Sequence, residues 1–449
     1  MLRPGHTDES SGNDADVRRY SSGDNDMAAL SGRASSTSPS SRSEPKPPSD
    51  DRLSALTDAK VDWLLLIQMS GFGIIALLPY NLILTELDFL NGSFQHYYAA
   101  ALSFLYSIAV NIVQILLIWY GNRFSFKPRI ILGCLLMAAG TLLTAVIAMV
   151  VDNSIIACLL ALICVSAMGV GYAELEQTAL GIAAMCPPSC TLSIMVGEGI
   201  AGLLPWPLYE LLKSILESSG VSPIPEWRCL ILFTIGSVLA LAMIPIYALG
   251  TARHPYIVQV LTIEQNRRVS SLSVRQTRRP VLAILKDVAP MGVCVWLTMA
   301  VTFVVFPAQS VLWRPQSPSN ANFVAQVTFT FQVLDTVGRA APSFLPALKG
   351  WGLFALVCCR VCFIPLFICT ALYLNTVPFF WDWFRHLEMA LLALTNGMTV
   401  TWSMVAGPQR VASDEAEQEV AGYFMPFALV HGILWGSVIA LLLNIALGQ

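Results

Sequence analysis

Charge is the property that this sequence has least of. Only 12% of its 449 residues are Asp, Glu, Lys or Arg, whereas a soluble globular protein carries about 25%. Apolar residues make up 55% of the chain, and its mean hydropathy is +0.63. So few charged groups cannot cover the surface of a water-soluble protein of this length. The composition therefore excludes a soluble protein and indicates an all-α, polytopic membrane protein.

Catalytic motifs are also lacking. There is no HExxH, no GxSxG, no Walker phosphate loop and no His, Cys and Asp grouped at the spacing of metal ligands. The eleven cysteines are scattered through apolar segments, Cys359 and Cys362 among them, and we expect small core residues. Residues 197–202 (GEGIAG) match a dinucleotide fingerprint formally, but they lack the βαβ context that it needs. We expect no enzyme, cofactor, metal, nucleic-acid partner or obligate protein partner.

Apolar windows of about 20 residues, long enough to cross a bilayer as helices, occur eleven times. They lie near residues 62–86, 97–120, 130–151, 154–182, 190–213, 228–250, 288–312, 323–345, 351–374, 383–405 and 418–446. Residues 1–60 are rich in Ser, Pro, Gly and Asp, so we expect a disordered cytosolic tail. The basic stretch 251–287 divides the spans into a bundle of six (61–250) and a bundle of five (288–449).

The distribution of basic residues predicts the orientation. Of the 26 Lys and Arg, eight lie in residues 1–60, three in 121–129 and seven in 251–287. All three groups fall on one side of the membrane if there are eleven spans. Because basic loops stay in the cytosol, we place the amino terminus and the loop 251–287 there, and the carboxyl end outside.

Two loop sequences suggest modification. The loop 251–287 carries Ser270, Ser271 and Ser273 among arginines. It is either a solvated connector or a place of anionic-lipid contact or phospho-regulation. Asn91-Gly92-Ser93 is a glycosylation sequon in the first outward loop, although that loop is short and holds the acceptor close to the membrane.

The most informative span is 323–345, because it carries Asp335 and Arg339 about half-way along. A charge at the bilayer centre costs roughly 2.5–3.5 kcal/mol on insertion scales, so two of them need a shared explanation. Their i, i+4 spacing puts them on one helix face, close enough to pair. Such a pair is either a structural clasp or the wall of a polar cavity that a solute occupies.

Other spans carry isolated polar groups. In the first span, Pro79 frees a backbone carbonyl, Asn81 adds a polar group, and Tyr80 offers a ring for stacking or for simple packing. The fourth span contains Glu176 and Gln177. Two carboxylates in one span, Glu174 and Glu176, are costly, so we expect at least one of them to face water or to be protonated.

Small residues, prolines and further polar groups mark helix contacts. Small residues let helices approach closely or form a moving contact, whereas charged groups near a span end are expected to be interfacial. For Glu174 in the fourth span, the alternative to a buried carboxyl is a position near the cytosolic membrane surface, where it would need no special role. The remaining positions are Gly197, Gly199 and Gly202 in the fifth span, Phe306 and Pro307 in the seventh, and His386, Glu388, Asn396 and Gly397 in the tenth.

Five stretches together resemble the equilibrative nucleoside transporter family. They are LLPYN (77–81), PPSCTLSIMVGEGIAG (187–202), VFPAQS (305–310), FQVLDTVGR (331–339) and TNGMTVTWSMVAGPQRV with the following EAEQEVAG (395–422). The resemblance covers essentially everything after residue 60. It implies a fold similar to major-facilitator transporters but one helix short, with six-plus-five bundles that rock about a central solute site.

The resemblance also implies a set of solute-binding residues. Asp335 and Arg339 match the family's Asp and Arg that contact the sugar and base of the substrate. A carboxylate accepts both ribose hydroxyls, and a guanidinium supplies a fixed fork of donors. Further expected contacts are Tyr80, Asn81, Glu176, Gln177, Gln332 and Phe306.

Two positions depart from the family pattern. Tyr80 replaces the usual Trp, and Glu176 aligns with a Gln, although a one-residue slip would put Gln177 there instead. An ionised Glu only accepts hydrogen bonds, so it should prefer the amino group of adenine. A protonated Glu176 would also donate and could couple transport to protons.

These observations favour a multi-pass carrier, expected in the plasma membrane, that moves nucleosides by facilitative alternating access. Purine nucleosides such as adenosine and inosine are the expected substrates. The first alternative is a proton-coupled carrier of nucleosides or nucleobases that uses Glu176. A remote alternative is a membrane-embedded receptor or enzyme that reuses the polar cavity.

Overall fold

A computed structural model describes residues 62–94, 98–271, 279–317, 322–346, 348, 350–373, 376–411 and 414–447. These residues form α-helices joined by short turns, and no β-strand occurs among them. They belong to one compact unit, Thr57–Gln449. The predicted tail, 1–60, lies outside the described residues, as does Ser273.

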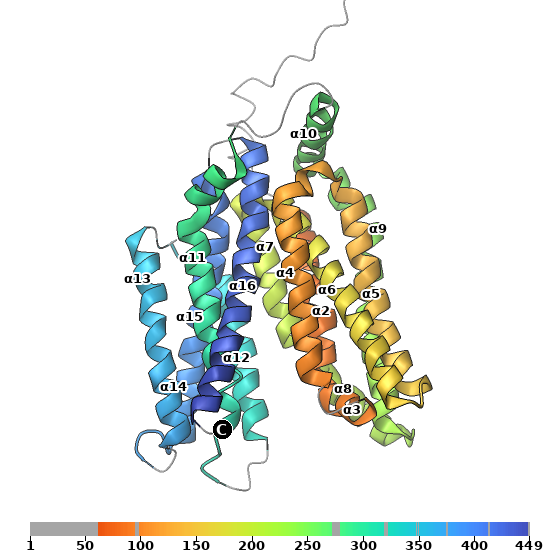
Figure 1. Ribbon diagram of the computed structural model, residues 1–449, viewed down its shortest axis with the longest axis vertical. Helices are drawn as coiled ribbons and strands as arrows, with labels where there is room; N and C mark the ends of the chain where they lie inside the picture. Colours follow the sequence, from red (N-terminus) through yellow and green to blue (C-terminus); the bar gives the residue numbers. More distant parts are fainter. Residues whose placement is uncertain are drawn as a thin grey trace, which may run out of the picture. The chain divides into compact units, whose positions relative to one another are not determined.

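The amino-terminal bundle contains the first six predicted spans (Figure 1). Its helices are α2 (Trp63–Thr85), α3 (Leu87–Ser93), α4 (Tyr98–Tyr120), α5 (Phe126–Val150), α6 (Ser154–Ala184), α7 (Pro188–Leu203), α8 (Pro205–Ser219) and α9 (Ile224–Leu249). Helix α6 begins directly after Asn153, whose side-chain oxygen accepts hydrogen bonds from the amides of Ile155 and Ile156. This cap explains how so short a turn joins two spans.

The carboxyl-terminal bundle follows the helix α10 (Pro255–Ser271). It consists of α11 (Val281–Val305), α12 (Phe323–Ala340), α13 (Trp351–Cys359), α14 (Phe363–Leu372), α15 (Asp382–Ala406) and α16 (Glu415–Leu447). The predicted loop 251–287 is therefore largely helical, and α11 begins seven residues before the expected position 288. Ser270 and Ser271 belong to the last turn of α10.

Ten helical segments among the described residues are long and apolar enough to cross a membrane. They coincide with ten of the eleven predicted spans. The remaining one, α12, has 18 residues but a more polar composition, because it carries Gln332, Asp335 and Arg339. A helix of that length spans about 27 Å, nearly the thickness of the hydrocarbon core. Helix α12 packs between α7 and α15, so its polar face is turned to protein.

Proline breaks the fifth predicted span, 190–213, into α7 and α8. Pro205 has no amide hydrogen to give to the Ala201 carbonyl one turn earlier. The side-chain amide of Asn81, on α2, donates to that carbonyl instead (3.1 Å). Asn81 thus supplies the hydrogen bond that the break removes, which lets an irregular backbone persist inside the bundle.

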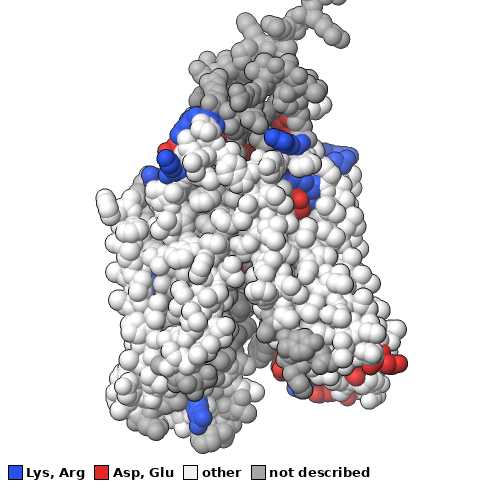
Figure 2. Space-filling model, viewed as in Figure 1, with Lys and Arg blue, Asp and Glu red and all other residues white. Residues whose placement is uncertain are grey.

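The two bundles meet along two seams. Helix α7 packs against α12, and α16 packs against α4 and α6. On the half of the molecule farther from α10, Figure 2 shows the surface hollowed between the bundles. On the half nearer α10, the space-filling surface is continuous across them (Figures 1 and 2).

Candidate solute site between the bundles

Asp335 and Arg339 form an ion pair on α12, as their spacing predicts. The Arg339 Nε donates to Asp335 Oδ2 at 2.8 Å. Both residues are buried, with 5% and 7% of their surface exposed. Because α12 contacts α7 on one side and α15 on the other, the pair faces protein and not lipid. A pair that faced lipid would have contradicted a role in a polar cavity.

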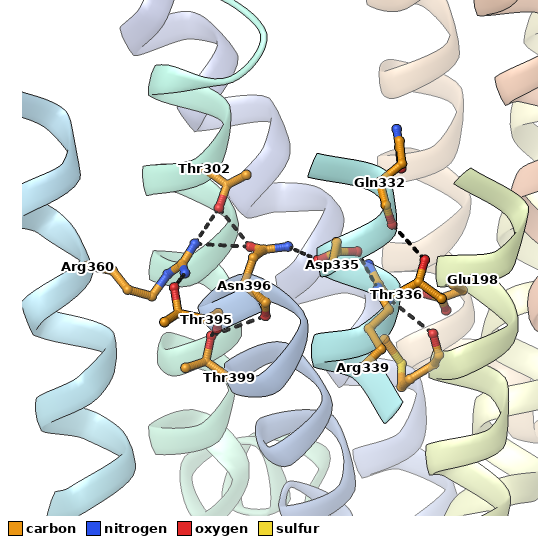
Figure 3. Close-up of polar contacts among 11 residues, drawn as sticks. Glu198, Thr302, Gln332, Asp335, Thr336, Arg339, Arg360, Thr395, Asn396 and Thr399 are labelled. Carbon is orange, nitrogen blue, oxygen red and sulfur yellow. Dashed lines mark hydrogen bonds and ion pairs between the residues drawn. The ribbon is translucent and has the colours of Figure 1, made fainter. Parts of the chain in front are cut away.

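Arg339 also joins the two bundles (Figure 3). Its Nη1 donates to Glu198 Oε2 on α7 at 2.8 Å and lies 3.4 Å from the Met195 carbonyl oxygen. Glu198 was not predicted as a site residue, since in the sequence it stands within the glycine run 197–202. The signal that could have identified it is a carboxylate flanked by two glycines in an apolar span, which needs a cationic partner on another helix.

The second oxygen of Asp335 is held from within the carboxyl-terminal bundle. Asn396 on α15 donates from Nδ2 to Asp335 Oδ1 at 2.7 Å. The Asn396 Oδ1 accepts from Thr302 Oγ1 at 2.7 Å and from Arg360 Nη2 at 3.2 Å (Figure 3). Asn396, predicted as a packing residue, therefore lies in the polar network. Arg360 was missed, although it is a lone Arg in the apolar span 351–374.

Glycines let the helices around this pair approach at backbone distance. A Cβ built on Gly199 would lie 3.0 Å from Thr336 Cα and 3.0 Å from Arg339 Cδ, across the bundle seam. A Cβ on Gly202 would lie 2.4 Å from Gln332 Oε1, and one on Gly397 would lie 2.2 Å from the Asp335 carbonyl oxygen. Gly197 has a different neighbour, the Ser70 carbonyl of α2, at 2.0 Å.

A row of tyrosines in the amino-terminal bundle leads to Glu176. The Tyr80 ring stacks on Tyr106 with centroids 4.2 Å apart, and Tyr106 contacts Tyr172 at 5.9 Å. Glu176 lies one turn after Tyr172 on α6 and is 1% exposed. Its Oε2 accepts from Gln114 Nε2 at 3.2 Å, and the Tyr172 side chain also lies within hydrogen-bonding reach of this carboxyl. No hydrogen bond to Oε1 is formed with good geometry among the described residues.

Gln177 faces a different direction from Glu176. Its Nε2 donates to the Gln114 carbonyl oxygen (3.2 Å) and to the Tyr423 carbonyl oxygen of α16 (2.8 Å). Gln177 is fully buried and its amide hydrogens are used between helices. This geometry favours Glu176, rather than Gln177, as the residue that continues the tyrosine row.

The bundles are also joined by side chains near the α10 end, which we call the closure cluster: Arg129, Glu174, Glu419 and Tyr423. Arg129 on α5 binds Glu174 of α6 (2.9 Å) and donates to the Tyr423 hydroxyl of α16 (2.8 Å). That hydroxyl donates to Glu419 Oε1 at 2.6 Å. Glu174 is thus one partner of a buried arginine.

The other predicted residues make contacts with side chains outside the Asp335 pair. Phe306 follows the end of α11, before Pro307, and stacks on Phe331 with centroids 4.1 Å apart. Asn91 lies in the helix α3, and its Oδ1 accepts from the Ala99 amide. Glu388, expected at an interface, is instead buried and accepts from Thr370 at 2.9 Å, while His386 lies 3.1 Å from Thr330 Oγ1.

Comparison with known proteins agrees with this architecture. In fold, the chain is similar to the proton:xylose symporter XylE of the major facilitator superfamily. That match has a TM-score of 0.58 and 13% identity, and it covers 88% of this chain and 90% of XylE. The major facilitator superfamily transporter FucP aligns with a TM-score of 0.54 and 14% identity, over 85% and 91% of the two chains.

In sequence, the chain is 28% identical to equilibrative nucleoside transporter 1 of Rattus norvegicus over 309 residues, 61% of this chain and 66% of the rat protein. The human protein of that name is 26% identical over 60% of this chain and 65% of its own length, so these matches span just under two thirds of those relatives. Equilibrative nucleotide transporter 7 of Arabidopsis thaliana is 22% identical over 81% and 91% of the two chains. A family model, Nucleoside transporter, matches residues 160–445. This chain is a multi-pass membrane protein that belongs to the nucleoside transporter family.

Proposed function

We propose that the protein is a facilitative carrier of nucleosides, with purine nucleosides such as adenosine and inosine as substrates. The observation that carries this proposal is the double bonding of Arg339. It binds Asp335 in its own bundle and Glu198 in the other, at the seam where α12 packs against α7. A clasp within one bundle would not need a carboxylate from the other.

The geometry supports a mechanism of alternating access. A bound ribose would offer hydroxyl donors to Asp335 and Glu198, and so compete with Arg339 for both carboxylates. Because the Arg339–Glu198 bond crosses the seam, this competition would loosen the contact between α7 and α12. The closure cluster must separate in the opposite phase of the cycle, when the site opens toward the α10 end.

The base of the solute would lie toward the tyrosine row. Tyr80 and Tyr106 present aromatic rings, and Glu176 Oε1 lacks a hydrogen-bond donor among the described residues. An exocyclic amino group, as in adenine, would supply that donor. This arrangement is the reason for preferring adenosine.

A second candidate function is proton-coupled transport of nucleosides or nucleobases. It is favoured by one observation: Glu176 and Glu198 are both buried, and each has one oxygen without a hydrogen-bond partner among the described residues. A proton on either carboxyl would supply a donor where none is seen. In this candidate, Glu176 takes up the proton.

The orientation follows from the charges at the two ends. In Figure 2, Lys and Arg gather at the end near α10, and Asp and Glu gather at the opposite end. By the positive-inside rule we place the α10 end in the cytosol, and the hollow then opens outward. The plasma membrane is the proposed location.

Uptake into proteoliposomes tests the proposal. We expect the full-length protein to exchange labelled adenosine across the bilayer without an imposed gradient, and an uncoupler to leave the rate unchanged. A rate that collapses with the uncoupler would support the proton-coupled candidate instead. Binding of adenosine without flux would mark a receptor, and chemical conversion of it would mark an enzyme.

The Asp335→Ala variant tests the site within the same assay. We expect uptake to fall at least about 100-fold, because a charged hydrogen-bond acceptor for ribose is lost. The matched control is Asp382→Ala, which removes a carboxylate at the start of α15, bonded to Arg385 and far along the helix from Asn396. Uptake near the unmodified rate in Asp335→Ala, at equal protein, would refute the assignment.

A further inference from the structure

Arg360 is a buried guanidinium without a carboxylate bonded to it among the described residues. It follows the last residue of α13 and begins the turn η5 (Arg360–Cys362) that separates α13 from α14. Only 1% of its surface is exposed, although it lies within a helical segment apolar enough to cross a membrane. A buried charge must be compensated, so the question is which group compensates this one.

The direct partners of Arg360 are neutral oxygens. Nη1 donates to the Leu392 carbonyl (3.0 Å) and to Thr395 Oγ1, both on α15. Nη2 donates to Thr302 Oγ1 on α11 (2.6 Å) and to Asn396 Oδ1 (3.2 Å). These dipoles solvate the guanidinium but carry no opposite charge.

The nearest negative charge in this network is Asp335, reached through one amide. Asn396 accepts from Arg360 on its oxygen and donates from its nitrogen to Asp335 Oδ1 at 2.7 Å. A donor bonded to the oxygen of an amide polarises the amide and strengthens the bond that its nitrogen donates. Figure 3 shows the chain of contacts from Arg360 through Asn396 to Asp335.

The network as a whole is balanced only if Arg360 is counted. Its carboxylates are Asp335 and Glu198, and its guanidiniums are Arg339 and Arg360. Arg339 alone would face two negative charges at the seam. All contacts from Arg360 to Asp335 lie inside the carboxyl-terminal bundle, so they survive when the Arg339–Glu198 bond breaks.

We propose that Arg360 is a positioning residue for the solute site. Through Asn396 it fixes the direction of the Asp335 carboxylate, and its charge balances the second carboxylate at the seam. Asn396 thereby keeps its hold on Asp335 Oδ1 also in the phase in which the solute competes with Arg339 for the other oxygen. This inference rests on the proposed function, because it takes Asp335 as the group that meets the solute.

A double-mutant cycle on the full-length protein tests whether Arg360 acts on Asp335 through Asn396. The KM and the maximal rate of labelled adenosine uptake are measured in proteoliposomes for Arg360→Gln, Asn396→Ala and the double variant. We expect each single change to raise KM about tenfold, as for a lost hydrogen bond to a charged group. The KM of the double variant should be no higher than the KM of the more impaired single variant, because both changes interrupt the same chain of contacts. Arg360→Lys, which keeps the charge but not the fork of donors, should restore part of the affinity.

The matched control is Arg228→Gln. Arg228 is also buried, but it pairs with Glu86 in the other bundle and has no contact with the network. We expect its KM to stay within about twofold of the unmodified value. If Arg360→Gln does not give monodisperse protein, the cycle is measured with Arg360→Lys in its place, under the same criterion of non-additivity.

The outcomes separate this inference from the proposed function. Additive effects of the Arg360 and Asn396 changes, or a fall in maximal rate with an unchanged KM, would overturn the positioning role. An Asp335→Asn variant that keeps the unmodified KM would instead overturn the role of Asp335 as the solute contact. Loss of affinity in Asp335→Asn with no change in Arg360→Gln would leave the carrier standing and refute the inference alone.

Discussion

At the scale of single residues, the carboxylates between the bundles differ in how fully they are bonded. Asp335 uses both oxygens, one on Arg339 and one on Asn396. Glu176 and Glu198 each keep one oxygen with no hydrogen-bond partner in the described part of the chain. A buried oxygen without a donor is costly, so we expect a donor from the solute to complete these groups.

The Glu176→Gln variant tests what this acceptor selects. A carboxylate only accepts hydrogen bonds, whereas an amide also donates them. The donating amide suits the carbonyl of inosine better than the amino group of adenosine. We expect the ratio of KM for inosine to KM for adenosine to fall about tenfold. Competition of labelled adenosine uptake by unlabelled inosine measures it.

The pH dependence of the same variant separates the two candidate functions. Identical uptake profiles for the unmodified protein and Glu176→Gln would rule out proton coupling through Glu176. The control is Glu388→Gln, which changes another buried carboxylate, on α15, that is bonded to Thr370 of α14. If Glu388→Gln changed the pH profile, or the ratio of KM for inosine to KM for adenosine, in the same way as Glu176→Gln, the effect would not be specific to Glu176.

The residue pairs that could be predicted were those within one helix. Asp335 and Arg339 pair because i, i+4 spacing fixes their geometry in any α-helix. Glu198 and Arg360 were missed as their partners, because they lie about 140 residues before and 21 residues after Arg339 in sequence. Only the packing of α7, α12 and α15 brings them together, and periodicity carries no information about which helices are neighbours.

At the scale of elements, the breaks in the spans decide where backbone polar groups become available. Pro205 separates α7 from α8 at Leu204, and η5 separates α13 from α14. At the first break, the Asn81 side chain donates to the Ala201 carbonyl that has lost its helical partner. At the second, the Arg360 side chain extends from η5 into the bundle and donates to Thr302. The spans themselves were predicted from their hydropathy, but the breaks at 204 and 360 were not.

The Asn81→Ala variant tests the first of these compensations. We expect it to destabilise the protein by about 1–2 kcal/mol, because the Ala201 carbonyl loses its donor in a partly buried setting. The measurement is the thermal unfolding midpoint of the purified protein in detergent. In a Pro205→Ala background, residue 205 has an amide hydrogen and can bond the carbonyl itself, so the effect of Asn81→Ala should be less than half as large. Equal effects in both backgrounds would contradict this account.

At the scale of the whole molecule, the bundles are held together by different chemistry at different depths. The Arg339–Glu198 bond joins α12 to α7, whereas the closure cluster of Arg129, Glu174, Glu419 and Tyr423 joins the bundles near α10. Close packing supports the second contact, since a Cβ on Gly181 would lie 2.4 Å from Tyr423 Cε1. A carrier must break each contact in turn, and the Tyr423 hydroxyl is the group shared between the bundles at the α10 end.

The Tyr423→Phe variant tests that assignment. Removing one hydroxyl deletes the bonds to Arg129 and Glu419 and leaves the ring packing in place. Only the bond to Arg129 crosses the seam, because Glu419 lies on α16 with Tyr423. Loss of this bond to a charged group should be worth about 1.4 kcal/mol, which corresponds to a tenfold larger population of the state open toward α10. Cys186, which is partly exposed between α6 and α7, serves as the native probe. We expect its labelling by a polar thiol reagent, followed by mass spectrometry of the protein in nanodiscs, to become about tenfold faster.

The control for this prediction is Tyr98→Phe, because the Tyr98 hydroxyl is buried without a hydrogen-bond partner among the described residues and lies within one bundle. It removes the same atom without touching the seam, so Cys186 labelling should keep its unmodified rate. Saturating adenosine gives a second comparison. If adenosine binds one open state better than the other, it should shift the Cys186 labelling rate of Tyr423→Phe and of Tyr98→Phe by the same factor. An unchanged rate in Tyr423→Phe, or an equal increase in Tyr98→Phe, would mean that the closure cluster packs the bundles together without controlling which side is open.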